Sequence, residues 1–434
     1  MSLVEGQQVE LTIEKAASGG RMIARHLGEI VLVRGAIPGE RVLAWIEKAE
    51  KRMAYAVTRE VLEPSADRRA TVGDPLCGGA LYAHIAYRRQ LSLKSDVIRD
   101  AFGRLGRHPL DVPVDVAASP EEGYRMRARL HVHGTRVGFF REGTHQLCDA
   151  GPTRQLTPAC LDAATTIADV LAREAPGAVV SISISENMPG TERAAYVELA
   201  PGAQVSEAML AGAVAAAKLQ GLASHDMKTG QSLAAGLPMV HDRLSDITAG
   251  GVGDGTLRRS AESFFQGNRF LIADLVRAVV DAIPAGGEVV DLYAGVGLFA
   301  VALAAGGHLE VTAVEGDRSS GADLRENARP HAPGLRARVE RVEDYLAARR
   351  GGAPATLVID PPRTGLSRDA AAAIVRLSPD RIVYVSCDPP TLARDARRLL
   401  DAGYQMHFLR GFDLFPNTPH VEALAAFSRA DSIS

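Results

Sequence analysis

The sequence is poor in cysteine and in aromatic residues, and it lacks an apolar run of the membrane-spanning kind. Four of its 434 residues are cysteines, too few for a disulfide scaffold, and their spacing matches no zinc-ligand pattern. We therefore expect a reducing compartment. The most apolar stretch, residues 289–307, is interrupted by Asp291 and by glycines, which indicates a buried strand, turn and helix. Residues 1–15 alternate apolar and charged side chains, so we expect no secretory signal and a cytoplasmic location.

The remaining composition is typical of a soluble globular protein. Apolar residues make up 46% of the chain and charged residues 23%, which excludes the disordered and fibrous classes. The net charge is only −3, but nucleic-acid binding depends on local basic patches, so this total decides nothing about partners. Because a single core rarely grows beyond ~250 residues, the length predicts two or three domains. We expect a monomer with no membrane partner.

The pattern of apolar residues divides the chain into three regions. Residues 1–63 contain short alternating segments between glycine and proline turns, which predicts a small β-barrel. Residues 64–258 predict a mixed α+β domain, beginning with an amphipathic helix over 90–105 that can pack on the last domain. Residues 259–434 alternate short apolar strands with helical stretches, typical of a doubly wound α/β domain. Within the middle region we expect strands over 124–132, 135–140, 179–186 and 194–199 and a helix over 158–174.

A glycine turn in the last region indicates a nucleoside cofactor. Gly295 and Gly297 lie between a predicted strand and a predicted helix and allow a ligand to approach the backbone. Glu315 ends the next strand, where an acid that binds ribose hydroxyls is expected. The turn contains no positive residue to bind a pyrophosphate. These features favour S-adenosylmethionine over a dinucleotide.

Two further strands end in residues suited to chemistry on a base. Asp360 follows one strand and begins an Asp-Pro-Pro-Arg segment, and Cys387 follows the next. Carbon 5 of uracil is too weak a nucleophile to attack a sulfonium methyl group, but addition of a thiolate to carbon 6 activates it. The carbon 5 proton must then be removed by a base. His420 and Glu422, in a loop before the last strand, are the candidates.

Six segments occur in an order and spacing that resemble the RNA uracil-5-methyltransferases of the bacterial ribosomal- and transfer-RNA type. They are SFFQGNRFL, DLYAGVG, VEGD, IDPPRTGL, VSCDP and FPNTPHVE. Residues 5–42 similarly resemble the TRAM RNA-binding barrel, an OB-like fold. The likeness covers nearly the whole chain and implies a Rossmann-like, S-adenosylmethionine-dependent methyltransferase domain behind an RNA-binding barrel, with RNA as the substrate.

The resemblance also assigns roles to individual residues. It implies that Cys387 is the nucleophile and Glu422 the base that removes the carbon 5 proton. It implies cofactor contacts for Gln266, Tyr293, Gly295, Glu315 and Asp360. The acid that meets the adenine stays open between Glu343 and Asp344, and Leu298 departs from the polar residue that many relatives have after the second glycine.

A second departure concerns metal. Ribosomal-RNA members often hold an iron-sulfur cluster on four cysteines, the middle pair in a C-G-G-C string. Here the string is Cys77-Gly-Gly-Ala80, Thr71 stands at the preceding position, and Cys148 alone lies near the last. Because one or two thiols do not retain such a cluster, we expect no iron-sulfur cluster and no other metal.

Arginines alternate along one predicted strand. Arg125, Arg127 and Arg129 share one face because side chains of a strand alternate between its two sides. A row of guanidinium groups suits the phosphates of RNA. We therefore predict that these three residues bind RNA.

Two other functions remain as alternatives. Methylation of cytosine carbon 5 also uses a cysteine adduct, but the Ser386-Cys387 pair and the Glu422 loop favour uracil. A non-catalytic RNA-binding protein with a relict cofactor fold is disfavoured by the joint presence of the residues above. The favoured substrate is 23S ribosomal RNA, with transfer RNA as the alternative.

Overall fold

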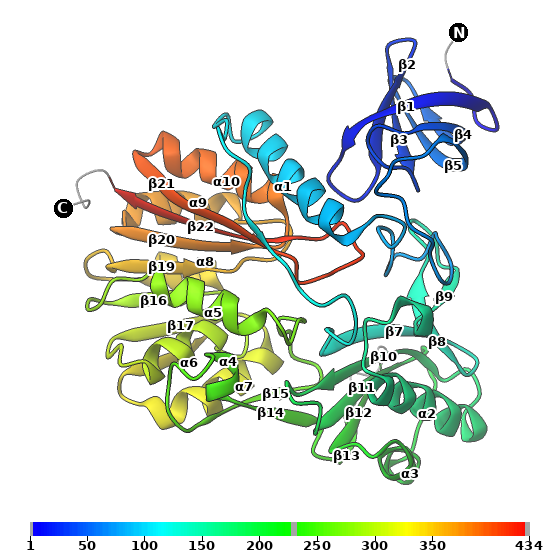
Figure 1. Cartoon of the computed structure of the whole chain (residues 1–434). Helices are drawn as coiled ribbons and strands as arrows, with labels where there is room; N and C mark the ends of the chain where they lie inside the picture. Colours follow the sequence, from blue (N-terminus) through cyan, green and yellow to red (C-terminus); the bar gives the residue numbers. More distant parts are fainter. Residues whose placement is uncertain (1–2, 227–231, 430–434) are drawn as a thin grey trace.

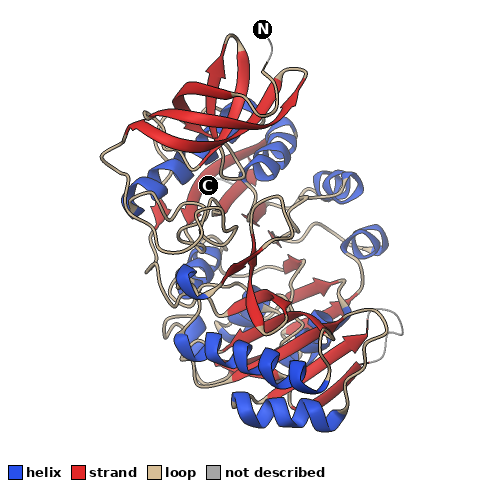
Figure 2. Ribbon diagram, turned by 90° about the vertical axis from the view of Figure 1, so that its right-hand side faces the viewer, coloured by secondary structure: helices blue, strands red, loops and turns tan. Residues whose placement is uncertain are grey.

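The computed structural model describes residues 3–226 and 232–429, which form an N-terminal barrel, a central sheet domain and a C-terminal α/β domain (Figure 1). Figure 2 shows the barrel at one end of the molecule and the central sheet with its helices at the other. Among these residues no helix is both long and apolar enough to cross a membrane. The predicted fold class is confirmed.

The barrel forms because each of its strands alternates buried and exposed side chains. In β1, for example, Val9, Leu11 and Ile13 point into the barrel and the residues between them point outward. The five strands close in the order β1-β2-β3-β5-β4, which leaves no free sheet edge. Their bounds are β1 Gln8–Ala16, β2 Met22–His26, β3 Glu29–Arg34, β4 Arg41–Glu50 and β5 Met53–Glu63.

The central domain is a seven-stranded sheet with helices on one face. Within the described residues its order is β13-β12-β11-β10-β7-β8-β9. The face with Leu130, Ile182 and Ile184 packs under helices α2 and α3, which lie on the side away from the α/β domain (Figure 1). The other face is polar. The elements are β7 Arg127–His133, β8 Arg136–Phe140, β9 Leu147–Asp149, η1 Gly151–Thr153, α2 Pro158–Glu174, β10 Val179–Glu186, β11 Arg193–Leu199, α3 Glu207–Ala217, β12 Gly221–Asp226 and β13 Ser232–Gly236.

The α/β domain is an eight-stranded sheet covered by helices on both faces. Its order over the described residues is β18-β17-β16-β19-β20-β22-β21-β6, with the first five strands parallel. The chain leaves β16 toward β17 and later returns to β19 on its other side. Such a reversal opens a crevice at the carboxyl ends of the two strands, where doubly wound folds bind ligands. The elements are β16 Val289–Leu292, β17 Val311–Glu315, β18 Leu335–Val339, β19 Thr356–Ile359, β20 Arg381–Ser386, β21 Tyr404–Phe412, β22 Glu422–Arg429, α5 Ile272–Asp281, α6 Leu298–Ala305, α7 Arg318–Ala328, η2 Arg329–His331, α8 Val342–Ala348, α9 Arg368–Leu377 and α10 Pro389–Asp401.

Two segments that precede residue 259 in the chain pack with the α/β domain. Helix α1 (Tyr87–Arg104) places Ile98 and Phe102 in that domain's core, and β6 (Val116–Ala117) pairs with β21 at the sheet edge. The ribbon of β14 (Met239–Arg243) and β15 (Thr256–Ser260), with the short helix α4 (Leu244–Ile247) between them, packs with the same domain through Leu244 and Leu257. The sequence predicted a helix over 90–105 that can pack on the last domain, and α1 does so, whereas the packing of β6 and of the β14–β15 ribbon was not predicted. The domain boundaries at 64 and 258 stay a prediction.

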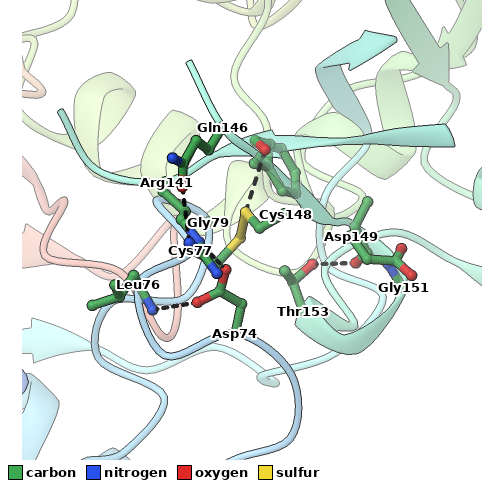
Figure 3. The surroundings of a disulfide bond; sticks show 12 residues. Asp74, Leu76, Cys77, Gly79, Arg141, Gln146, Cys148, Asp149, Gly151 and Thr153 are labelled. Atoms are coloured by element: carbon green, nitrogen blue, oxygen red, sulfur yellow. Dashed lines mark hydrogen bonds and ion pairs between the residues drawn. A yellow bond between two sulfur atoms is a disulfide. The ribbon is translucent and has the colours of Figure 1, made fainter. Parts of the chain in front are cut away.

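One disulfide links the segment after the barrel to the central sheet. Cys77 and Cys148 are bonded although 71 residues separate them in the sequence (Figure 3). The pair is buried beside the Arg141–Asp74 ion pair. We expected no disulfide scaffold, and this single bridge is not one, but the cysteine count did not predict it. The absence of an iron-sulfur cluster stays a prediction, and no metal-binding group of three or more ligands occurs among residues 3–226 and 232–429.

Candidate active site

A cavity of about 660 Å³ opens at the carboxyl ends of β16, β19 and β20. Volumes of this order are typical of sites for nucleotide-sized ligands. All seven residues that the sequence indicated for catalysis or cofactor binding line this one cavity: Gln266, Tyr293, Gly295, Glu315, Asp360, Cys387 and Glu422. They come from six separate segments of the chain, so the topology of the sheet brings them together.

The glycine turn after β16 is shaped by its backbone conformation. Tyr293, Gly295 and Gly297 all have positive φ angles, of 63°, 56° and 96°. Gly297 favours glycine, because a side chain is strained at a φ of 96° and its Cβ would lie 2.8 Å from the Leu324 side chain. The amide of Gly295 donates to Glu315 Oε2 at 2.7 Å, and Asp317 donates its amide to Oε1 at 2.6 Å. These bonds fix the Glu315 carboxylate at the cavity wall with lone pairs left for ligand hydroxyls.

A buried carboxyl group lies beneath the turn. Asp291 is fully buried; its Oδ2 accepts from the amide of Ala300 at 3.1 Å, and its Oδ1 has no hydrogen-bond partner among the described residues. Asp360 lies nearby and accepts from Gln266 Nε2 at 3.2 Å. Burial raises the pKa of Asp360 to about 7, and the charge of Glu315 adds to this effect, whereas the Gln266 hydrogen bond opposes it. A cationic ligand in the cavity would favour ionisation of Asp360.

Cys387 and Glu422 are neighbours across two antiparallel strands. β20 pairs with β22 so that Ser386 lies opposite Ala423. The next residue on each strand is Cys387 on one side and Glu422 on the other, which places the thiol beside the carboxyl group. Asp388 follows Cys387 and caps helix α10, because its side chain accepts from the amide of Thr391. The cysteine is thus held between a strand end and a helix start.

Burial controls the protonation of this pair. It raises the pKa of Cys387 to about 11, and the Glu422 carboxylate adds to the rise while Arg363 opposes it. Glu422 is 2% exposed, and burial together with the charge of Asp360 raises its pKa well above the usual value. Its Oε1 has no hydrogen-bond partner in the described chain. The thiol is therefore protonated in the free protein at neutral pH, and burial favours the protonated form of Glu422.

Arg363 is the one basic residue among the cavity-lining side chains described. It faces the Cys387 thiol, where its charge favours the thiolate. Its Nη2 lies 3.4 Å from His420 Nδ1. Burial lowers the pKa of His420 to about 4, with Arg363 contributing, so this imidazole is neutral at pH 7. His420 does not line the cavity, which favours Glu422 as the base.

The charges in the cavity suit a cationic cofactor. Five carboxyl side chains line it, those of Glu262, Glu315, Asp317, Asp360 and Glu422, against the single guanidinium of Arg363. A pyrophosphate would be repelled by this lining, whereas the sulfonium and ammonium groups of S-adenosylmethionine would be attracted. The residues predicted to contact that molecule line the cavity, and the contacts themselves stay a prediction: Gln266, Tyr293, Gly295, Glu315 and Asp360.

Other sequence-indicated residues lie elsewhere. Glu343 and Asp344, the alternatives for the adenine contact, lie in the first turn of α8 and do not line the cavity; Glu343 accepts instead from Ser367 Oγ at 2.8 Å. Asp317 does line it. Its signal in the sequence was its position two residues after Glu315 in the VEGD segment.

The predicted arginine row is present but its members differ. Arg125 lies against the aromatic rings of Phe139 and Phe415 and donates to Gln155. Arg127 and Arg129, on β7, line a second and smaller cavity beside the first. RNA contact by the three arginines stays a prediction, and this geometry supports it more strongly for the latter two. The second cavity was not foreseen, because its residues come from strands whose order the sequence does not reveal.

Comparison with known proteins agrees with this geometry. Residues 351–429 match the tRNA (uracil-5-)-methyltransferase family, and residues 3–58 match the TRAM domain. The 23S rRNA (uracil(1939)-C(5))-methyltransferase RlmD of Alkalilimnicola ehrlichii is 33% identical, over 97% of this chain and 96% of that protein. An RNA methyltransferase of uncharacterised specificity from Streptomyces coelicolor is 32% identical, over 99% of this chain and 94% of its own length.

A solved structure shows the same fold over nearly the whole chain. The tRNA (uracil-54, C5)-methyltransferase of Pyrococcus abyssi, in complex with S-adenosyl-L-homocysteine, matches with a TM-score of 0.74 and 21% identity, over 96% of this chain and 99% of that one. This structural similarity supports the fold. Family membership follows from the sequence relatives that match over nearly the whole chain. This protein belongs to the RNA uracil-5-methyltransferase family of S-adenosylmethionine-dependent enzymes.

Proposed function

We propose that this protein methylates carbon 5 of a uridine in 23S ribosomal RNA, with Cys387 as a covalent nucleophile and Glu422 as the base. The observation that carries the proposal is the cross-strand pairing that places Cys387 beside Glu422 in the cofactor cavity. The methyl group comes from S-adenosylmethionine, which supplies an electrophilic carbon on a sulfonium when bound. Cytosine chemistry is less favoured, and the joint presence of nucleophile, base and cofactor cavity argues against a purely RNA-binding role.

The first step is formation of the thiolate and its addition to the ring. The charge of Arg363 favours loss of the Cys387 proton to solvent, which leaves Glu422 available for the later step. The sulfur then bonds to carbon 6 of the uracil, and the electron pair of the carbon 5–carbon 6 double bond moves toward the carbonyl at position 4, giving an enolate. Because the thiol lies inside a cavity, the uridine must leave its stack to reach it, as in other base-modifying enzymes.

The second half of the reaction needs the carboxylate. Once carbon 5 carries the methyl group, Glu422 accepts the proton of that carbon, the double bond reforms, and the Cys387 thiolate leaves carbon 6. Glu422 must be ionised for this step, although burial raises its pKa in the free protein. The charge of Arg363 favours its ionised form.

The trapping experiment uses Glu422→Gln. An amide does not accept the proton, so the methylated RNA should stay bonded to Cys387 and migrate as a labelled complex in denaturing electrophoresis with methyl-labelled S-adenosylmethionine. The double variant with Cys387→Ala is the matched control and should show no complex. Free turnover by Glu422→Gln would place the base elsewhere, with His420 the next candidate, and a trapped complex in the double variant would refute Cys387 as nucleophile.

Transfer RNA is the second candidate substrate. It is favoured by the description of the family that matches residues 351–429, whereas three sequence relatives of 28%, 31% and 33% identity are named as 23S rRNA (uracil(1939)-C(5))-methyltransferases. Mass-spectrometric mapping of 5-methyluridine in RNA from cells lacking the protein separates the two. We further propose that the enzyme acts as a monomer in the cytoplasm.

A further inference from the structure

Beside the cofactor cavity lies a second cavity of about 330 Å³ on the polar face of the central sheet. It is formed by three neighbouring strands and by the segment that leads into the cofactor cavity. Its lining residues are Arg127 and Arg129 of β7, Ser183 of β10, Tyr196 and Glu198 of β11, and Glu262. The cofactor cavity accounts for none of these residues except Glu262, which lines both.

The register of the strands explains why these side chains converge. Ser183 lies opposite Arg129 on one side and opposite Tyr196 on the other, so the three form a row across the sheet. The serine is small, and it leaves a hollow between the larger arginine and tyrosine. Helices α2 and α3 cover the opposite face of the sheet (Figure 1), so the hollow lies on the face that these helices leave free.

The two cavities are joined by one stretch of chain. Met126 donates its amide to the carbonyl of Gly267 at 2.7 Å, and Arg269 donates to the carbonyl of Tyr124 at 3.0 Å. The segment entering β7 is thereby paired with the segment that carries Glu262 and Gln266. A ligand in the second cavity therefore lies next to whatever occupies the first.

The polar groups of the second cavity do not suit a phosphate alone. Arg127 and Arg129 supply donors, but the carboxylates of Glu198 and Glu262 would repel an anion. Glu198 is held by Arg129 and by Ser181 Oγ at 2.6 Å. The Glu262 carboxylate has no ion-pair or hydrogen-bond partner within the part of the chain that the structure describes. The Nε of Arg127 is buried and also lacks a partner there. A terminal nitrogen of Arg127 donates to the backbone carbonyl of Glu262 at 3.2 Å, so the guanidinium group lies beside this carboxylate in one hollow.

We propose that this cavity is a nucleobase subsite that takes a guanine of the same RNA, close to the target uridine. This subsite rests on the proposed function, because the guanine belongs to the RNA that the protein is proposed to methylate. The Watson–Crick edge of guanine presents N–H donors at N1 and N2 beside the O6 acceptor, which matches the carboxylate of Glu262 and the guanidinium of Arg127. Tyr196 supplies an aromatic face for stacking, as proteins that read unpaired RNA bases commonly do.

The test uses a library of RNA hairpins whose loop has a fixed central uridine and random bases elsewhere. The full-length enzyme methylates the library with labelled S-adenosylmethionine, and the methylated molecules are sequenced. We expect guanine to be enriched roughly tenfold or more at one loop position. The variants Glu262→Ala and Tyr196→Ala should remove this preference. Glu174→Ala, on the exposed end of α2 across the sheet, is the matched control and should retain it.

Each outcome has one meaning for the subsite. A preference for another base at that position, or a guanine preference unchanged by Glu262→Ala, would overturn the proposal. A uniform loss of activity on all loops, with a smaller salt dependence, would show phosphate binding instead and would also overturn it. Failure of the proposed function looks different, because no 5-methyluridine would then form in any library member.

Discussion

Gln90 and Asn417 exchange two hydrogen bonds across 327 residues of sequence. The amide of Asn417 donates to Gln90 Oε1 at 2.9 Å, and Gln90 Nε2 donates to Asn417 Oδ1 at 2.9 Å. Gln90 is fully buried in α1, and Asn417 lies in the loop between β21 and β22 with a φ of 63°. The loop ends at Glu422. Helix α1 therefore holds the loop that presents the proposed base.

Substitution of Gln90 should impair catalysis more than cofactor binding. In Gln90→Ala the loop loses both bonds, and displacement of a reacting group by about an ångström lowers rates roughly 10- to 100-fold. We expect a lower kcat, covalent RNA adducts that persist longer because Glu422 is misplaced, and an unchanged Kd for S-adenosylmethionine. Gln90→Glu, which keeps one acceptor, should lie between the two. Equal losses in cofactor affinity and in kcat would indicate a general folding defect.

Reactivity of Cys387 should follow pH and depend on Arg363. With its pKa raised to about 11, the thiol should be alkylated by iodoacetamide about tenfold faster for each pH unit until that value is approached. Arg363→Gln removes a positive neighbour, raises the pKa further and should slow alkylation at pH 8. Arg363→Lys keeps the charge and is the control. Rates that are equal in all three proteins would exclude the guanidinium as a cause.

The buried ion pair between Lys94 and Asp413 should matter for stability. Both side chains are fully buried, and burial lowers the pKa of Lys94 while Asp413 opposes that effect. Lys94→Met leaves the carboxylate without its partner and should cost about 3–5 kcal/mol. The exposed Lys15–Asp100 pair offers a comparison, because Lys15→Met should cost less than ~1 kcal/mol. Thermal denaturation measures both, and the double variant Lys94→Met/Asp413→Asn should recover part of the loss.

Removal of the Cys77–Cys148 bridge should lower the melting temperature. A cross-link that closes a loop of 71 residues stabilises by about 4 kcal/mol in the chain-entropy treatment. Cys148→Ala should therefore melt earlier than the oxidised wild type, and a reductant should bring the wild type toward the variant. Alkylation under denaturing, non-reducing conditions should modify Cys160 and Cys387 but not the two bridged cysteines. Four free thiols and a melting temperature indifferent to reductant would contradict the bridge.

Purified protein also allows the expected absence of an iron-sulfur cluster to be tested. We expect purified protein to be colourless even when prepared without oxygen, because the residues at Thr71 and Ala80 are not thiols. Iron analysis is the measurement. About four iron atoms per chain would contradict the expectation.

The sequence by itself determined the local elements and the chemical identity of the site. Helix α2 and strand β10 have the predicted bounds, 158–174 and 179–186. In the structure Thr157 caps the start of α2, an interaction that acts within a few positions of the chain. Motif spacing indicated three of the site residues, because each motif lies within one or two adjacent elements of the chain. These residues are Gly295, Glu315 and Cys387.

Only the tertiary structure decided which distant residues meet. The order of strands in the sheets sets Cys387 beside Glu422 and joins Ser183 with Arg129 and Tyr196. The packing of α1, β6 and the β14–β15 ribbon on the α/β domain, and the Cys77–Cys148 bridge, likewise join parts far apart in the chain. Such contacts depend on long-range strand pairing and on the burial of apolar faces against one another. The periodicity of the sequence shows that an element has an apolar face, but it does not show which partner covers that face.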